Sequence, residues 1–104
     1  MNKQLLSKIK LKQARVGIVG LGYVGLPLAV EFASAGFSVT GIDTSIERVD
    51  QINKGGNYIV DVDDVKLASL VESGLLTSTS DYSAVLDLDA ISICVPTPLS
   101  KLKD

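Results

Sequence analysis

The sequence predicts an α/β fold in which short parallel strands alternate with helices. Uncharged segments rich in β-branched residues, such as 16–19 and 90–95, have the composition of buried strands. The segments between the strands carry apolar residues at helical spacing, with capping residues and glycines at their ends. Because parallel strands need crossover connections, this alternation indicates a single parallel sheet with right-handed crossovers.

The elements are expected to follow one another from residue 15 to residue 104, and residues 1–14 are expected to form a separate amphipathic helix. The expected strands are 16–19, 37–42, 75–78 and 90–95. The expected helices are 24–35, 45–53, 63–72 and 81–86, with a loop at 57–62. Two full halves of a doubly wound domain supply about six strands, so residues 15–104 are expected to be a truncated domain.

Composition and charge exclude several classes of protein. With 46% hydrophobic and 21% charged residues, the 104-residue chain has the balance of one globular domain. Its net charge of −2 provides no positive field for nucleic acid. The absence of His and the single Cys exclude a structural zinc site and a disulfide framework. A lone Cys also fits a reducing cytoplasm.

The uncharged segment 16–30 resembles a membrane span only in its hydropathy. Its length of about 15 residues is below the roughly 20 that a spanning helix needs, and glycines and a proline interrupt it. We therefore expect a cytoplasmic protein with no membrane partner.

A glycine-rich turn joins the first strand to the first helix. Residues 20–25 read G-x-G-x-x-G, in the context of a dinucleotide-binding fingerprint. Gly20 permits the tight turn, Gly22 lets a diphosphate approach the backbone, and Gly25 lets the helix pack closely on the sheet. The free N–H groups of the helix N-terminus attract the diphosphate.

An acidic residue completes this fingerprint. Asp43 ends the second strand, near the ~20-residue spacing at which such a residue binds the adenosine ribose. Its charge would repel a 2′-phosphate, which favours NAD over NADP. The fingerprint predicts a Rossmann-like doubly wound sheet with strand order 3-2-1-4. The alternative is a structural strand–turn–helix with a solvent-facing Asp.

Two more residues are candidate cofactor contacts. Arg48 lies one helical turn into the next helix and could reach a ribose or phosphate, or pair on the surface with Glu47 or Asp50. Thr97 lies between two prolines after the fourth strand, which neighbours the first strand at the cofactor crevice. A simple proline turn is the alternative for Thr97.

Two other features are given structural interpretations. Cys94 falls in a strand that we expect to be buried, and no His exists to activate it, so it is interpreted as a packing residue. The acidic residues of segment 61–72 resemble part of a calcium loop. Val65 and Lys66 stand where a ligand and a glycine are required, so helix capping is the better account.

Several motifs together carry a family resemblance. They are V-G-I-V-G-L-G-Y-V-G-L-P-L-A-V at 16–30, G-I-D at 41–43, Arg48, N-K-G at 53–55 and C-V-P-T-P at 94–98. The chain resembles the UDP-glucose/GDP-mannose dehydrogenase family, in particular its UDP-N-acetylglucosamine 6-dehydrogenase type. By motif match, the resemblance implies NAD contacts at Tyr23, Val24, Asp43, Arg48 and Thr97.

The resemblance also implies an activity for the full-length enzyme. Members oxidise the C6 alcohol of a UDP-sugar to a carboxylate with two NAD⁺, through a thiohemiacetal on a catalytic Cys. Members are homo-oligomers with much longer chains, and the catalytic Cys and the sugar site lie beyond residue 104. The chain alone is therefore expected to be inactive, with its fourth strand as an unpaired edge.

Two alternatives stay open at this point. One is the NAD domain of another two-domain dehydrogenase, such as the 3-hydroxyacyl or 6-phosphogluconate type. The G-Y-V-G-L-P run at 22–27 and the proline-flanked Thr97 argue against it. The other is a short, non-catalytic NAD-binding module. FAD is disfavoured because its fingerprint usually places Glu at the position of Asp43.

Overall fold

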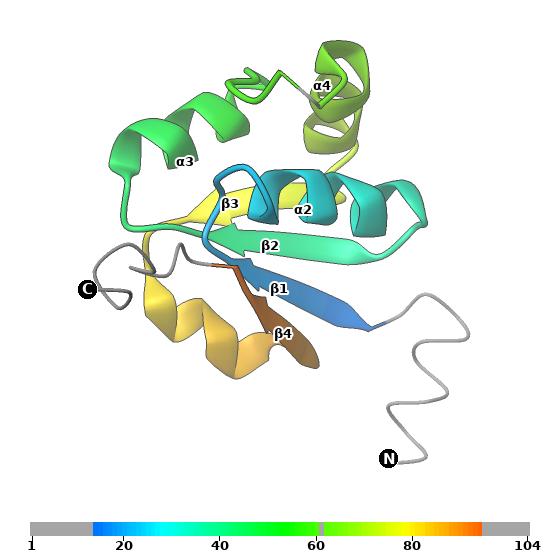
Figure 1. Cartoon of the computed structure of the whole chain (residues 1–104). Helices are drawn as coiled ribbons and strands as arrows, with labels where there is room; N and C mark the ends of the chain where they lie inside the picture. The colour runs from blue at the N-terminus through cyan, green and yellow to red at the C-terminus, as the bar shows by residue number, and fades with distance from the viewer. Residues whose placement is uncertain (1–13, 61, 95–104) are drawn as a thin grey trace, which may run out of the picture.

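A four-stranded parallel sheet forms the centre of the structure, a computed structural model that describes residues 14–60 and 62–94. The strands stand in the order β3-β2-β1-β4, and each neighbouring pair is parallel (Figure 1). Their bounds are β1 Arg15–Val19, β2 Ser38–Ile42, β3 Leu76–Thr79 and β4 Ala90–Ile93. The Rossmann-like arrangement and the 3-2-1-4 order predicted from the sequence are confirmed.

Helices cover the sheet unequally. Figure 1 shows α2 (Gly25–Ser34), α3 (Ile46–Asn53) and α4 (Asp64–Glu72) on one face. The 3-10 helix η1 (Tyr82–Asp87) lies on the other face. The α-helices start and stop within a residue of the expected bounds, whereas the last expected helix is a 3-10 helix. The predicted helix at 1–14, apart from Ala14, and Thr97 lie outside the described residues.

Short polar side chains start the helices. The Ser45 hydroxyl accepts a hydrogen bond from the Arg48 N–H at 3.3 Å and begins α3. The Asp63 carboxylate accepts from the N–H groups of Val65 and Lys66 at 2.9 and 3.1 Å and begins α4. Asp63 is thus a capping residue, as the sequence indicated.

The core lies between the sheet and the face of α2, α3 and α4. Its side chains come from strand positions that face these helices and from the helix positions that face the sheet. The largest fully buried ones are Ile18, Leu21, Leu26, Val39, Ile42, Ile52, Leu67 and Leu76. In the described part of the chain, no helix is long and apolar enough to cross a membrane.

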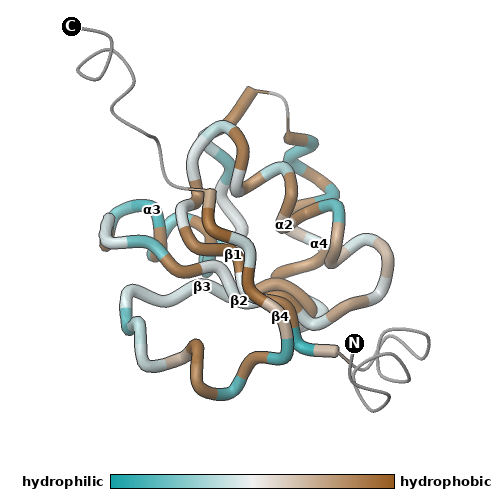
Figure 2. The backbone as a smooth tube through the Cα atoms, turned by 60° about the horizontal axis from the view of Figure 1, so that its bottom comes forward, coloured by the Kyte–Doolittle hydropathy of each residue, from teal (hydrophilic) through white to brown (hydrophobic). Residues whose placement is uncertain are grey.

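The expectation of a buried fourth strand is wrong. Ile91 and Ile93 of β4 are 45% and 71% exposed, although their composition is that of a core strand. The reason is that β4 pairs with β1 alone and that only η1 among the described elements lies on that face. Figure 2 shows β4 as an apolar segment at the front of the turned molecule. The expectation of an unpaired edge is thereby confirmed for the described strands.

Cys94 follows β4 directly. Its N–H donates to the Val19 carbonyl at 2.7 Å, which extends the β1–β4 pairing by one residue. The side chain is partly buried and packs against the core. The interpretation of Cys94 as a packing residue is confirmed, with less burial than expected.

Polar side chains join α3 to β3. The Asn53 amide donates to the Ser78 carbonyl at 2.9 Å and accepts from the Ser78 N–H at 2.9 Å. The Ser78 hydroxyl is buried and donates to the Val49 carbonyl at 2.8 Å. Asn53 therefore replaces the strand partner that the outer edge of β3 lacks among the described residues.

We expect Asn53→Ala to lower the free energy of unfolding by about 1–3 kcal/mol, because it leaves both backbone groups of Ser78 without this partner. Urea denaturation followed by circular dichroism measures the change. Ser73→Ala is the control, since it removes one exposed bond, from the Ser73 hydroxyl to the Leu70 carbonyl. Equal effects of the two substitutions would contradict a special role of Asn53.

Candidate cofactor site

The glycine turn joins the ends of the two central strands. Gly20 has a φ of 94°, a conformation that favours glycine, and its N–H donates to the Ile42 carbonyl at 2.8 Å. The chain thus leaves β1, bonds once to the last residue of β2 and turns into α2. This places the turn at the carboxyl ends of the strands, where ligands of open α/β sheets bind.

The second and third glycines have different surroundings. A Cβ on Gly25 would lie 1.6 Å from the Gly20 carbonyl oxygen, so α2 begins in direct contact with the turn. A Cβ on Gly22 would meet only the Arg48 Nη1, at 3.7 Å. Gly25 therefore allows the close packing of helix and turn, and Gly22 leaves open space over the turn.

The N-terminus of α2 is free to receive an anion. Its cap residue Val24 forms no side-chain capping bond, and the first turn has no acidic residue. Tyr23 is 81% exposed, and Val24 is exposed as well. The partial positive charge of this helix end is not neutralised by the described side chains, and a phosphate would supply the missing acceptor.

Asp43 is buried, with only 7% of its surface exposed. One carboxylate oxygen accepts from the Leu21 N–H at 2.8 Å, and the other accepts from the Ser45 N–H at 2.8 Å. The alternative of a solvent-facing Asp is therefore wrong. Each oxygen keeps lone pairs for a further donor, such as a ribose hydroxyl.

Arg48 pairs with Asp43 instead of the surface carboxylates considered from the sequence. Its Nη1 lies 3.6 Å from the Asp43 Oδ2, and 44% of its side chain is exposed. Its guanidinium carbon lies 5.6 Å from the centre of the Tyr58 ring, in the range of a cation–π contact. Arg48 is thereby held beside the glycine turn with part of its surface open to solvent.

Tyr58 is a site neighbour that sequence reasoning missed. Its hydroxyl donates to the Leu21 carbonyl at 2.6 Å. Burial raises the pKa of Tyr58 to about 12, while Arg48 lowers this pKa and Asp43 raises it. The hydroxyl therefore keeps its proton at neutral pH and acts as a donor. The sequence indicated only a loop at 57–62, and loop residues carry no periodic signal.

A hollow of about 200 Å³ lies over the turn. It brings together the glycine turn, the end of β2, Arg48 and a tyrosine from η1. Its lining residues are Gly20, Leu21, Gly22, Asp43, Thr44, Arg48 and Tyr82. The sequence did not predict that Thr44 and Tyr82 line this hollow. Thr44 could have been found because it follows Asp43 directly. Tyr82 could not, because it reaches the hollow only through the position of η1 on the other face of the sheet. The open space at Gly22 and the uncapped N-terminus of α2 fit a diphosphate, and the buried Asp43 carboxylate fits the ribose of a dinucleotide.

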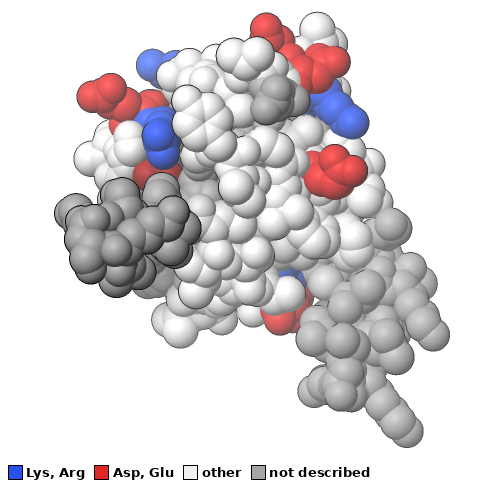
Figure 3. Space-filling view, in the orientation of Figure 1, with Lys and Arg blue, Asp and Glu red and all other residues white. Residues whose placement is uncertain are grey.

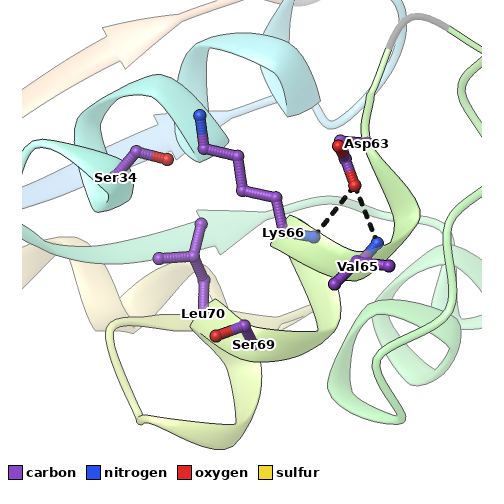
Figure 4. Close-up of a pocket in the computed structure, with 6 residues that line it drawn as sticks. All are labelled: Ser34, Asp63, Val65, Lys66, Ser69 and Leu70. Atoms are coloured by element: carbon purple, nitrogen blue, oxygen red, sulfur yellow. Dashed lines mark hydrogen bonds between the residues drawn. The ribbon is translucent and has the colours of Figure 1, made fainter.

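The other hollows lack such a combination. One of about 410 Å³ lies where the end of α2 meets the start of α4 (Figure 4). Figure 4 shows Lys66 extending from α4 towards α2 and Asp63 occupied with capping. On the face in Figure 3, Lys and Arg lie singly near Asp and Glu, so charge does not mark a second site there.

The fold and this site define a dinucleotide-binding domain of the Rossmann class. The NAD binding domain of the UDP-glucose/GDP-mannose dehydrogenase family matches residues 14–104. The chain belongs to that family, and its cofactor is NAD.

Curated relatives agree with this assignment. UDP-N-acetyl-D-mannosamine dehydrogenase of Pyrococcus horikoshii is 38% identical over 83% of this chain, and that of Escherichia coli K12 is 42% identical over 82%. GDP-mannose 6-dehydrogenase of Pseudomonas aeruginosa is 40% identical over 86%. The matches cover 20–21% of these relatives, so the chain spans about a fifth of their length.

Solved structures share the fold at similar identity. A ternary complex of GDP-mannose dehydrogenase from Pseudomonas aeruginosa superposes with a TM-score of 0.77 and 41% identity, over 81% of this chain and 20% of the other. The UDP-D-ManNAc dehydrogenase from Pyrococcus horikoshii superposes with a TM-score of 0.76 and 36% identity, over 81% of this chain and 20% of the other. The truncated domain expected from the sequence agrees with this coverage.

The expected subtype needs correction. The sequence resemblance favoured the UDP-N-acetylglucosamine type, whereas these three relatives are named for N-acetylmannosamine and GDP-mannose. The reason is that the motifs used for the resemblance include no residue with an assigned sugar contact, so they could not distinguish the sugar.

We expect Gly25→Ala to destabilise the fold by more than about 3 kcal/mol, because the new methyl group would overlap the Gly20 carbonyl and force α2 off the turn. Thermal unfolding measures the loss. Gly22→Ala is the matched control, since its methyl group meets only Arg48, at 3.7 Å. We expect it to change stability by less than about 0.5 kcal/mol. A stable Gly25→Ala variant would contradict the packing of α2 against the turn.

Proposed function

We propose that this chain is the first part of the NAD domain of an enzyme that oxidises the C6 alcohol of a nucleotide sugar to a carboxylate. The observation that carries the proposal is the 200 Å³ hollow lined by the glycine turn and the buried Asp43, where the turn leads into the uncapped N-terminus of α2. Family membership supports an NAD-dependent dehydrogenase.

Different residues of the site would contact different parts of the cofactor. Gly20, Gly22 and Gly25, with the exposed Tyr23 and Val24, form the turn that would hold the diphosphate.

Asp43 would accept hydrogen bonds from the adenosine ribose, and Arg48 would approach the ribose or a phosphate from its exposed side. Thr97, which lies outside the described residues, stays a proposed contact on the basis of the sequence.

The chemistry of oxidation belongs to the cofactor and to residues outside this chain. When bound, NAD⁺ would supply the hydride acceptor for the oxidation, and the described residues would bind and orient it. Cys94 is partly buried at the core, and the sequence has no His to activate a thiol. We therefore propose that the chain alone does not turn over a nucleotide sugar.

The substrate class is inferred from the relatives. Several are named for UDP-N-acetyl-D-mannosamine, and one for GDP-mannose. We favour a UDP-N-acetylhexosamine with a free C6 hydroxyl as the substrate of the full-length enzyme. A cytoplasmic location and a homo-oligomeric full-length enzyme belong to the same proposal.

We expect the chain to bind NAD⁺ at least about tenfold more tightly than NADP⁺, because a 2′-phosphate would lie against the buried Asp43 carboxylate. Titration of the isotope-labelled chain with each dinucleotide, followed by amide chemical shifts, measures both affinities. Shifts should concentrate at residues 20–25 and at Asp43. Equal affinities would contradict the role of Asp43, and no binding of either would contradict the proposed function.

Gly22→Ala should weaken NAD⁺ binding by about tenfold or more while the fold stays intact, because its methyl group occupies the open space over the turn. The same titration measures the affinity, and circular dichroism checks the fold. Ser73→Ala is the control for a substitution away from the turn, since it removes only one exposed hydrogen bond, from the Ser73 hydroxyl to the Leu70 carbonyl. If Gly22→Ala binds NAD⁺ as tightly as the unsubstituted chain, the diphosphate does not bind over Gly22 and this part of the proposal is contradicted.

A further inference from the structure

We propose that Tyr58 is a positioning residue of the NAD site, which orients the Leu21–Gly22 peptide of the glycine turn through a hydrogen bond to Leu21. The inference rests on the proposed function, since it takes this turn as the diphosphate site. Tyr58 does not line the 200 Å³ hollow and so acts through the residues that do.

Leu21 is held on three sides. Its N–H donates to the Asp43 carboxylate at 2.8 Å, and its carbonyl accepts from the Tyr58 hydroxyl at 2.6 Å. Its fully buried side chain lies so close to Gly41 that a Cβ there would stand 2.7 Å away. The residue at the centre of the turn therefore has its N–H, its carbonyl and its side chain each held by a different partner.

The carbonyl bond determines where the next N–H points. A trans peptide is planar, and its C=O and N–H point in opposite directions. Because Tyr58 draws the Leu21 carbonyl towards itself, the Gly22 N–H points away from Tyr58. No acceptor for this N–H is present among the described residues. A phosphate oxygen over Gly22 would supply one.

The same side chain supports the cation of the site. The Arg48 guanidinium lies over the Tyr58 ring, and Arg48 also contacts Asp43. Asp43 in turn accepts from the Leu21 N–H, and Leu21 accepts from Tyr58. The four residues therefore form a closed ring of contacts. The hydroxyl of Tyr58 thus orients the backbone donor, and the ring of Tyr58 supports Arg48.

Other contacts also hold the loop that carries Tyr58. Asn57 accepts from the Ile59 N–H at 2.9 Å and donates to the Asp64 carboxylate at 2.8 Å. Gln51 donates to the Asn57 carbonyl at 3.2 Å, and Ile59 is buried in the core. Because these contacts hold the loop without the Tyr58 hydroxyl, that hydroxyl is available to act on the glycine turn.

The test compares Tyr58→Phe, which removes only the hydroxyl, with Tyr58→Leu, which also removes the ring. Titration of the full 104-residue chain with NAD⁺ gives the affinities. We expect Tyr58→Phe to weaken NAD⁺ binding about threefold to tenfold, the value of one hydrogen bond. Tyr58→Leu should lose a further factor of about two to five, through the contact with Arg48.

A second readout separates positioning from stability. In Tyr58→Phe without NAD⁺, the amide resonance of Gly22 should shift, and its hydrogen exchange should change more than that of residues in β2. Ser73→Ala is the matched control, because it also removes one hydroxyl bond to a backbone carbonyl. It should leave the affinity and the Gly22 resonance unchanged.

The outcomes separate this inference from the proposed function. If the unsubstituted chain binds NAD⁺ and Tyr58→Phe binds it equally well, the inference is overturned and the proposed function stands. If Tyr58→Phe loses spectral dispersion throughout, Tyr58 supports the whole fold and the positioning role is also overturned. If the unsubstituted chain does not bind NAD⁺, both fail.

Discussion

The hydrogen bond from the Leu21 N–H to the buried Asp43 carboxylate is the contact on which the site depends. It joins the glycine turn after β1 to the residue after β2, and the second carboxylate oxygen binds the Ser45 N–H at the start of α3. A buried carboxylate is tolerated only where donors surround it, and here backbone N–H groups and Arg48 supply them. The same arrangement places a negative charge in the lining of the hollow over the glycine turn.

Close backbone packing is the second constraint. The contact of Gly25 with the Gly20 carbonyl lets α2 start directly on the turn, so the positive end of its dipole lies over the carboxyl ends of β1 and β2. Gly41 gives Leu21 the room to enter the core beneath the turn. Gly25 and Gly41 thus bring a strand, a turn and a helix closer than residues with a Cβ allow.

The sheet has one covered face and one largely uncovered face, in a chain that spans about a fifth of the length of the relatives it matches. One face carries α2, α3 and α4, whereas β4 exposes Ile91 and Ile93 and pairs with β1 alone among the described strands. An exposed apolar edge of this kind favours pairing with a further strand. In a doubly wound fold, the downstream half supplies such a strand and covers the same face.

The sequence alone determined the order of elements, the 3-2-1-4 sheet, the glycine turn and the acidic residue after the second strand. The elements and the turn depend on local rules, since periodicity, caps and glycine spacing act over a few residues. The sheet order follows from the doubly wound topology that the glycine fingerprint predicts. Only the tertiary structure decided that Asp43 is buried, that Arg48 pairs with it and that Tyr58 reaches Leu21. The Leu21–Asp43 and Leu21–Tyr58 contacts join residues 22 and 37 positions apart, which no local pattern encodes. Arg48 lies five residues from Asp43, but Glu47 and Asp50 are nearer in sequence, so its partner was decided by the fold. The exposure of β4 was likewise decided by its neighbours in the sheet, because an apolar strand is buried only where other elements cover it.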